Sequence, residues 1–176
     1  SAFSLKTARA YFRTLREIIH AVAPHQLYIG CRFAGVNELA AQAANESCDV
    51  VSYNIYQRQI ADSQIIPGDK PVLIGEFHFG ALDRGMFHTG LVPTKNQGER
   101  AACYKAFVTA CLRNPRYVGT HGSKWRDRAL PGRGDGENYQ IGFLTVTDQP
   151  YPELVQAARE IAATMYVTRY EKTSAN

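Results

Sequence analysis

The sequence lacks any apolar run long enough to cross a bilayer, so no membrane-spanning segment is predicted. It also lacks a dense run of lysine and arginine, because its 20 basic and 16 acidic residues are spread along the chain, with a formal net charge of +4. This pattern indicates an ordinary solvated surface and argues against nucleic acid or a membrane surface as partner. The first six residues have neither the basic start nor the apolar run of a signal peptide.

Cysteines are few and are poorly spaced for cross-links or metal binding. The four cysteines form no CxxC pair, and Cys103 and Cys111 lie eight residues apart on one predicted helix, too far for a bridge between them. No histidine and carboxylate spacing suggests a catalytic metal, and no GxGxxG or Walker loop suggests a nucleotide. We therefore expect no cofactor and no metal, and we expect the cysteines to pack as small apolar residues.

Helical and strand-like segments alternate along a chain that is 45% hydrophobic, which favours one packed α/β domain over residues 1–176. Predicted helices cover 7–23, 36–46, 97–113 and the segment from Pro152 towards Tyr170, and predicted strands cover 27–33, 49–56, 71–78 and 116–121, with a further short strand at 141–146. The alternation predicts a parallel sheet with right-handed crossovers. Both a doubly wound sheet and part of a (β/α)₈ barrel fit it, although a complete barrel has eight strands.

A carboxylate near the end of an apolar strand is the strongest chemical feature. Glu76 follows Gly75 in the run VLIGEFHFG (72–80), and a long glycine-containing loop continues over 79–96. Buried strands rarely contain Glu unless it is paired or lies at the strand end. Two interpretations remain open from the residues alone: a catalytic carboxylate at the active face of a sheet, or a loop-starting Glu paired with an arginine.

Four collinear motifs carry a resemblance to a known family. They are CRFAG (31–35), DVVSYNIY (49–56), GEFHFGALDRGMFHTGL (75–91) and DGENYQIGFLTVTDQPYPELV (135–155). The sequence resembles glycoside hydrolase family 50, the exo-acting β-agarases, over nearly its whole length. The resemblance implies an α/β fold in which this chain is the C-terminal half of a (β/α)₈ TIM barrel, with strands five to eight.

The resemblance implies that Glu76 is the nucleophile of a retaining glycosidase, which attacks the anomeric carbon and forms a covalent glycosyl-enzyme. The family's acid/base, an Asn-Glu pair closing the fourth strand, has no counterpart here. The dipeptide Asn37-Glu38 is of the right type, but its place after a strand-ending glycine predicts a helix start instead.

Further candidates are assigned to substrate binding at the same active face. In the family's clan a tyrosine after the sixth strand holds the nucleophile, but strand alternation puts Tyr53 on the opposite face from Asn54 and Tyr56, and the sequence leaves open which set packs inward. Arg32, in the first predicted strand, needs a partner, and Glu76 is one candidate. The remaining predicted substrate contacts are His78, His88, His121, Trp125, Glu137 and Asn138.

One departure from the family is a missing aromatic residue. Where the family has tryptophan directly after the strand-ending histidine, this chain has Gly122 after His121, and its tryptophan comes later, at Trp125. An aromatic platform for a sugar ring is therefore not expected at position 122. Trp125 is either recruited in its place or packs as an ordinary core residue.

The resemblance implies cleavage of β-1,4-galactosidic bonds in agarose or agaro-oligosaccharides, and a secreted or periplasmic location. Two alternatives are a β-galactosidase of the same clan and a non-catalytic fragment. Because half a barrel leaves sheet edges and apolar surface uncovered, we expect a homo-oligomer or a complex with an N-terminal half-barrel.

Overall fold

A computed structural model describes residues 1–35, 37–60 and 68–170, and Val36, the first residue of one predicted helix, lies outside them. The described residues form two compact units. The first comprises 1–35, 37–55, 68–75 and 116–121, and the second comprises 56–60, 76–115 and 122–170. None of the helices in these ranges is both long and apolar enough to span a membrane.

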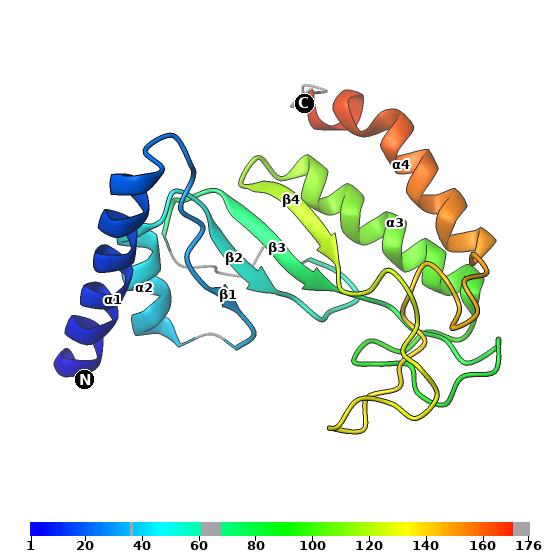
Figure 1. Cartoon of the computed structure of the whole chain (residues 1–176). Coiled ribbons are helices and arrows are strands. Elements are labelled where there is room, and N and C mark those ends of the chain that lie inside the picture. Colours follow the sequence, from blue (N-terminus) through cyan, green and yellow to red (C-terminus); the bar gives the residue numbers. More distant parts are fainter. Residues whose placement is uncertain (36, 61–67, 171–176) are drawn as a thin grey trace. The chain divides into compact units, whose positions relative to one another are not determined.

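Four strands form one sheet in the order β1-β2-β3-β4: β1 Arg32–Phe33, β2 Val51–Asn54, β3 Val72–Phe77 and β4 Tyr117–Gly122. β1 and β2 pair in parallel. β3 and β4 also run in one direction, because the Val72 N–H donates to Arg116 while the Ser123 N–H donates to Phe77. The arrows of β2, β3 and β4 point the same way in Figure 1. The predicted α/β fold with a parallel sheet is confirmed.

In the first unit, helices α1 (Ala2–Val22) and α2 (Glu38–Ser47) pack against each other. α2 begins where its capping residue predicts, since the Asn37 side chain accepts the backbone N–H groups of Leu39 and Ala40. Asn37-Glu38 is therefore a helix start, as predicted. Arg9 pairs with Glu46 at 2.6 Å and links the two helices.

One predicted strand is much shorter than expected, and another does not form. The strand predicted over 27–33 shrinks to β1, because Gly30 has a φ of +69° and leaves the extended conformation. A side chain at Gly30 would also lie 2.5 Å from the Cys48 sulfur. The segment 141–146 forms no strand, and only Leu144 makes isolated bridges, to Arg126 and to Pro150.

In the second unit, α3 (Gln97–Arg113) packs against α4 (Pro152–Tyr170). α3 has the bounds that the sequence predicts, because Asn96 caps the Glu99 N–H at 2.9 Å and the Glu99 carboxylate accepts the N–H of Lys95. Phe77 at the end of β3 stacks on Phe107 of α3, with ring centroids 4.6 Å apart. This stacking packs the end of β3 against α3.

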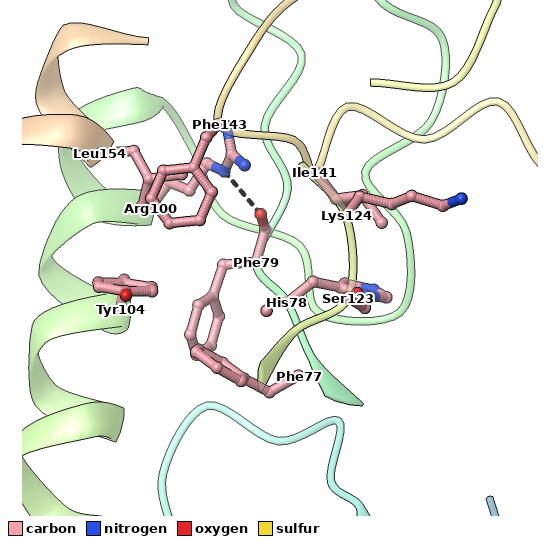
Figure 2. Close-up of a pocket in the computed structure, with 11 residues that line it drawn as sticks. Phe77, His78, Phe79, Arg100, Tyr104, Ser123, Lys124, Ile141, Phe143 and Leu154 are labelled. Carbon is pink, nitrogen blue, oxygen red and sulfur yellow. Dashed lines mark hydrogen bonds between the residues drawn. The ribbon is translucent and has the colours of Figure 1, made fainter. Parts of the chain in front are cut away.

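A buried arginine joins α3 to two long loops, one over 79–96 and the other over 123–151. Arg100 is 1% exposed, and its guanidinium donates to the carbonyls of Phe79 (2.7 Å) and Gly142 (2.6 Å) and to the Gln97 side chain (3.0 Å). Figure 2 shows the bond to Phe79 beside a cavity of about 20 Å³. Burial lowers the pKa of Arg100 to about 10, while the nearby Asp127 carboxylate opposes that shift. The guanidinium remains charged and supplies donors that no apolar residue could replace.

We expect Arg100→Met to lower the free energy of unfolding by about 3–5 kcal/mol, because two buried carbonyls lose their donors and Asp127 loses a compensating charge. Urea denaturation followed by circular dichroism measures the effect. Arg159→Met, the same change at an exposed position of α4, is the control and should shift stability by less than about 0.5 kcal/mol. Equal stability of the two variants would contradict this assignment.

Candidate active site

A cleft of about 260 Å³ opens in the second unit. Glu76, the residue before the last in β3, lines this cleft, so the carboxylate lies at a strand end as predicted. Other segments contribute mainly polar and charged side chains. The lining residues are Tyr56, Glu76, His78, Leu91, Ser123, Lys124, Arg128, Arg133, Glu137, Tyr139 and Ile141.

Tyr56 holds the carboxylate of Glu76. Its hydroxyl donates a hydrogen bond to Glu76 Oε2. Such a bond stabilises the ionised carboxylate and fixes its orientation, which an attacking nucleophile requires. The residue before Glu76 must be small, because a Cβ at Gly75 would lie 2.4 Å from Cγ and Cδ of Arg32 and 2.7 Å from Oγ of Ser52. Glycine at position 75 of β3 therefore leaves the room that the Arg32 side chain occupies.

The sequence left open whether Tyr53 or Tyr56 faces the site, and in the structure it is Tyr56 that lines the cleft. Tyr53, which was predicted as a substrate contact, is 2% exposed, stacks on Phe33 with centroids 5.3 Å apart and does not line the cleft. Its hydroxyl lies near the Asn45 amide without a well-formed hydrogen bond to any described residue. Asn54 is half-buried, and its Oδ1 also has no partner among the described residues. Asn54 does not line the cleft.

His78 lines the cleft but already uses both ring nitrogens. Nε2 accepts the Leu91 N–H at 2.9 Å, and Nδ1 lies 2.8 Å from Ser123 Oγ. The ring also packs on Tyr56, with centroids 4.9 Å apart. A hydrogen bond from His78 to a sugar, as predicted from the sequence, would have to replace one of these protein contacts. Both ring nitrogens therefore face protein groups in this structure.

Glu137 is a second carboxylate in the cleft, and it is occupied by arginines. Arg128 forms an ion pair with Glu137, and Arg133 approaches it at 3.3 Å. Arg128 also stands over the Tyr139 ring, 5.7 Å from its centroid. The predicted sugar contact by Glu137 therefore competes with two guanidinium groups.

The other predicted substrate contacts lie outside the cleft lining. His88 is exposed, accepts the Gly90 N–H at 3.0 Å and contacts the Tyr139 ring in a tilted arrangement, with centroids 4.8 Å apart. Trp125 is 71% exposed and stacks on Phe143, so it is an exposed ring supported on one face. The remaining three are Arg32, exposed in β1, His121, exposed in β4, and Asn138, half-buried beside Glu137.

Sequence reasoning missed much of the cleft wall. Ser123 and Lys124 follow β4 directly, and Tyr139 adjoins the predicted pair Glu137-Asn138, so proximity to assigned residues was a usable signal. Arg128 and Arg133 carried no comparable signal, because only the folded loop brings them to Glu137. At Gly122, an added Cβ would meet only Phe143 Cε2, at 3.6 Å, so no steric conflict requires the glycine.

The arrangement supplies one oriented carboxylate, a phenol donor and several cationic side chains. This arrangement suits attack of the carboxylate on an electrophilic carbon, which forms a covalent ester. Within the described ranges, no group of three or more histidine, cysteine, aspartate or glutamate side chains is placed to hold a metal ion.

Two curated proteins are similar to the sequence over most of its length. β-Agarase B of Vibrio sp. strain JT0107 is 41% identical over 169 residues, which cover 92% of this chain, and β-agarase A of the same strain is 43% identical over 90% of it. The chain spans only 18% and 17% of the lengths of these relatives. No family model matches the sequence.

Solved structures give the same result. The agarase AgWH50C has a TM-score of 0.90 and 40% identity, and its alignment covers 95% of this chain and 25% of that one. PfGH50B, whose designation carries the family number, has a TM-score of 0.89 and 36% identity, covering 95% and 24%. Motifs, fold and relatives therefore agree that this chain matches part of the β-agarases and of the agarase structures of glycoside hydrolase family 50.

Proposed function

We propose that this chain is part of a retaining glycoside hydrolase that cleaves β-1,4-galactosidic bonds of agarose, and that Glu76 is its nucleophile. The observation that carries the proposal is the Tyr56–Glu76 hydrogen bond in an open cleft, in a chain 41% identical to a β-agarase. The curated relatives are named as agarases, which favours agarose over a simple galactoside as the substrate.

In the proposed reaction a carboxylate oxygen of Glu76 attacks the anomeric carbon of the galactose unit. The bond to the leaving sugar oxygen breaks, and the carbon becomes esterified to Glu76. Tyr56 donates to Oε2, so it orients the carboxylate for attack. The leaving oxygen needs a proton from a second carboxyl group about 5–5.5 Å from the first. Glu137 is a poor candidate for this acid because two arginines already engage it.

We therefore propose that the four strands are the fifth to eighth of a (β/α)₈ barrel and that another half-barrel supplies the acid. The sheet supports this view, because β1 and β4 each have a single neighbouring strand in the described sheet. One face of α1 also leaves apolar side chains exposed at helical spacing, namely Tyr11, Ile18 and Val22. Agarose is an extracellular polysaccharide, so the proposal includes export of the protein.

The nucleophile can be tested without the acid. A 2-deoxy-2-fluoro-β-galactoside with a dinitrophenolate leaving group needs no proton to depart, so Glu76 should form a stable ester with the fluorosugar. Mass spectrometry of the labelled chain should place one fluorogalactosyl group on the peptide that contains Glu76. Glu76→Gln should take no label, and Glu160→Gln, at an exposed site on α4, should label normally. A label on any other residue would refute Glu76 as the nucleophile.

Tyr56→Phe should slow this labelling by about 10- to 100-fold, because a charge-assisted hydrogen bond contributes about 1.5–3 kcal/mol. Tyr53→Phe is the matched control, since it removes a hydroxyl that lies outside the cleft and lacks a well-formed bond among the described residues. Its labelling rate should stay within about twofold of the unmodified chain. Equal rates for the two variants would mean that Tyr56 does not orient the carboxylate.

The half-barrel proposal predicts that the chain alone releases no sugar from agarose. Addition of the N-terminal half-barrel of a family 50 agarase should give a complex in sedimentation and release of agaro-oligosaccharides, and neither half should release sugar alone. With Glu76→Gln, the complex should form but release nothing. A chain that stays monomeric and unbound in this mixture would contradict the half-barrel proposal. Release from a chromogenic galactoside but not from agarose would instead identify a β-galactosidase.

A further inference from the structure

His78 is buried at the junction of three segments of the cleft wall. Only 6% of the residue is exposed, and it follows the end of β3 directly. The ring contacts Tyr56 on one side, and its nitrogens face Ser123 after β4 and Leu91 of the 79–96 loop. Figure 2 shows the His78 ring beside Ser123.

The hydrogen bonds fix the protonation of the ring. Leu91 is the donor in its bond, since a backbone N–H cannot accept, so Nε2 must carry a lone pair. The neutral ring then carries its proton on Nδ1, which donates to Ser123 Oγ at 2.8 Å. Each nitrogen therefore has one defined task, and the doubly protonated ring would lose the bond to Leu91.

The loop is shaped to meet this ring. Gly90 has a φ of +75°, and a Cβ there would lie 2.7 Å from His78 Nε2. Glycine thus allows the backbone to approach closely enough for the Leu91 N–H to reach the imidazole. Leu91 itself is 56% exposed and lines the cleft, so its side chain does not anchor it in a core. A second tie holds the loop further along, where the N–H groups of Gly80 and Thr94 donate to Val92 and Gly80.

We propose that His78 is a positioning residue, a neutral latch that holds the Leu91 segment in the wall of the Glu76 cleft and supports the Tyr56 ring behind the nucleophile. The latch is a property of the loop and can be measured without turnover. Its contribution to catalysis rests on the function proposed above. The bond to Leu91 and the contact with Tyr56 place one imidazole between the loop and the residue that orients Glu76.

Electrostatics around the ring agree with a neutral latch. Burial lowers the pKa of His78 to about 4, the Glu76 carboxylate opposes the shift, and the Arg100 and Arg128 guanidinium groups add to it. Two tyrosine side chains, Tyr56 and Tyr139, also face the ring. An unfolded histidine has a pKa of about 6.5, so the latch contributes its full stability above that pH and loses it as pH falls towards about 4.

Nitrogen-15 NMR of the histidine rings tests the protonation directly. At pH 6 the His78 ring should be neutral, with its proton on Nδ1 and an unprotonated Nε2, and the exposed His25 ring in the same sample is the internal reference. Ser123→Ala should shift the population towards protonation on Nε2. A charged His78 at pH 6, or a proton on Nε2 in the unmodified chain, would overturn the latch.

Hydrogen exchange of the Leu91 amide tests the loop. His78→Phe keeps an aromatic ring against Tyr56 but removes the acceptor, so Leu91 should exchange about tenfold faster, and His25→Phe should leave the rate unchanged. An unchanged rate in His78→Phe would refute the proposal. If His78→Phe fails to fold, Ser123→Ala should still accelerate exchange at Leu91, and a normal rate there would count equally against the latch.

Labelling by the fluorosugar separates this proposal from the proposed function. If the unmodified chain takes no label while Leu91 is protected and His78 carries its proton on Nδ1, the glycosidase proposal fails and the latch stands. If the unmodified chain labels Glu76 but His78→Phe labels at the same rate, His78 has no positioning role in the reaction. We expect labelling of His78→Phe to be about tenfold slower than that of the unmodified chain.

Discussion

The Arg100 guanidinium is the interaction on which the second unit depends. It is a charge surrounded by protein, and its donors end on the carbonyls of Phe79 and Gly142, which belong to the two long loops of this unit. Asp127 provides the compensating charge and is itself held by the Tyr151 hydroxyl (2.5 Å) and the Gly142 N–H (2.7 Å). Because burial raises the pKa of Asp127 and lowers that of Arg100, each group retains its charge through the presence of the other and of these hydrogen bonds.

This buried network explains how long glycine-containing loops form a cleft of defined shape. Loops of this length without secondary structure of their own are uncommon in compact domains. Here one loop is tied to the helix at Phe79 and closes on itself at Gly80, and the other is tied at Gly142. The residues between these ties, including Leu91 and Tyr139, are then presented to the same cavity as Glu76. Polar contacts in the interior therefore position side chains that lie on the surface.

Much of the fold was predictable because its signals are local. α3 has the predicted bounds, 97–113, because its cap at Asn96 and its end at Asn114-Pro115 are written in adjacent residues. β3 and its terminal carboxylate were predictable from an apolar run that ends in Glu76. The strand over 27–33 was overestimated because hydrophobicity does not reveal the positive φ of Gly30. The segment 141–146 has a strand-like composition but only isolated bridges.

The residues of the candidate site were likewise predictable where the signal is local in the sequence, and not where it depends on distant segments. The family resemblance predicted a tyrosine beside Glu76, but alternation left Tyr53 and Tyr56 both open, and only the packing shows that the Tyr56 hydroxyl bonds Glu76. Arg128 could not be found, because its contact with Glu137 depends on how the loop over 123–151 folds back. The assignment of His78 was incomplete for a similar reason: the partners of both nitrogens come from segments 13 and 45 residues away.

Position 122 shows how a site of this kind can change without a change of fold. Its φ does not lie in the left-handed region, and only one atom of Phe143 lies within 4 Å of an added Cβ. Neither the backbone conformation nor the neighbouring atoms therefore require glycine at position 122. A side chain can therefore be gained or lost at the end of β4 by replacing one residue, while the path of the strands and the position of Glu76 stay unchanged.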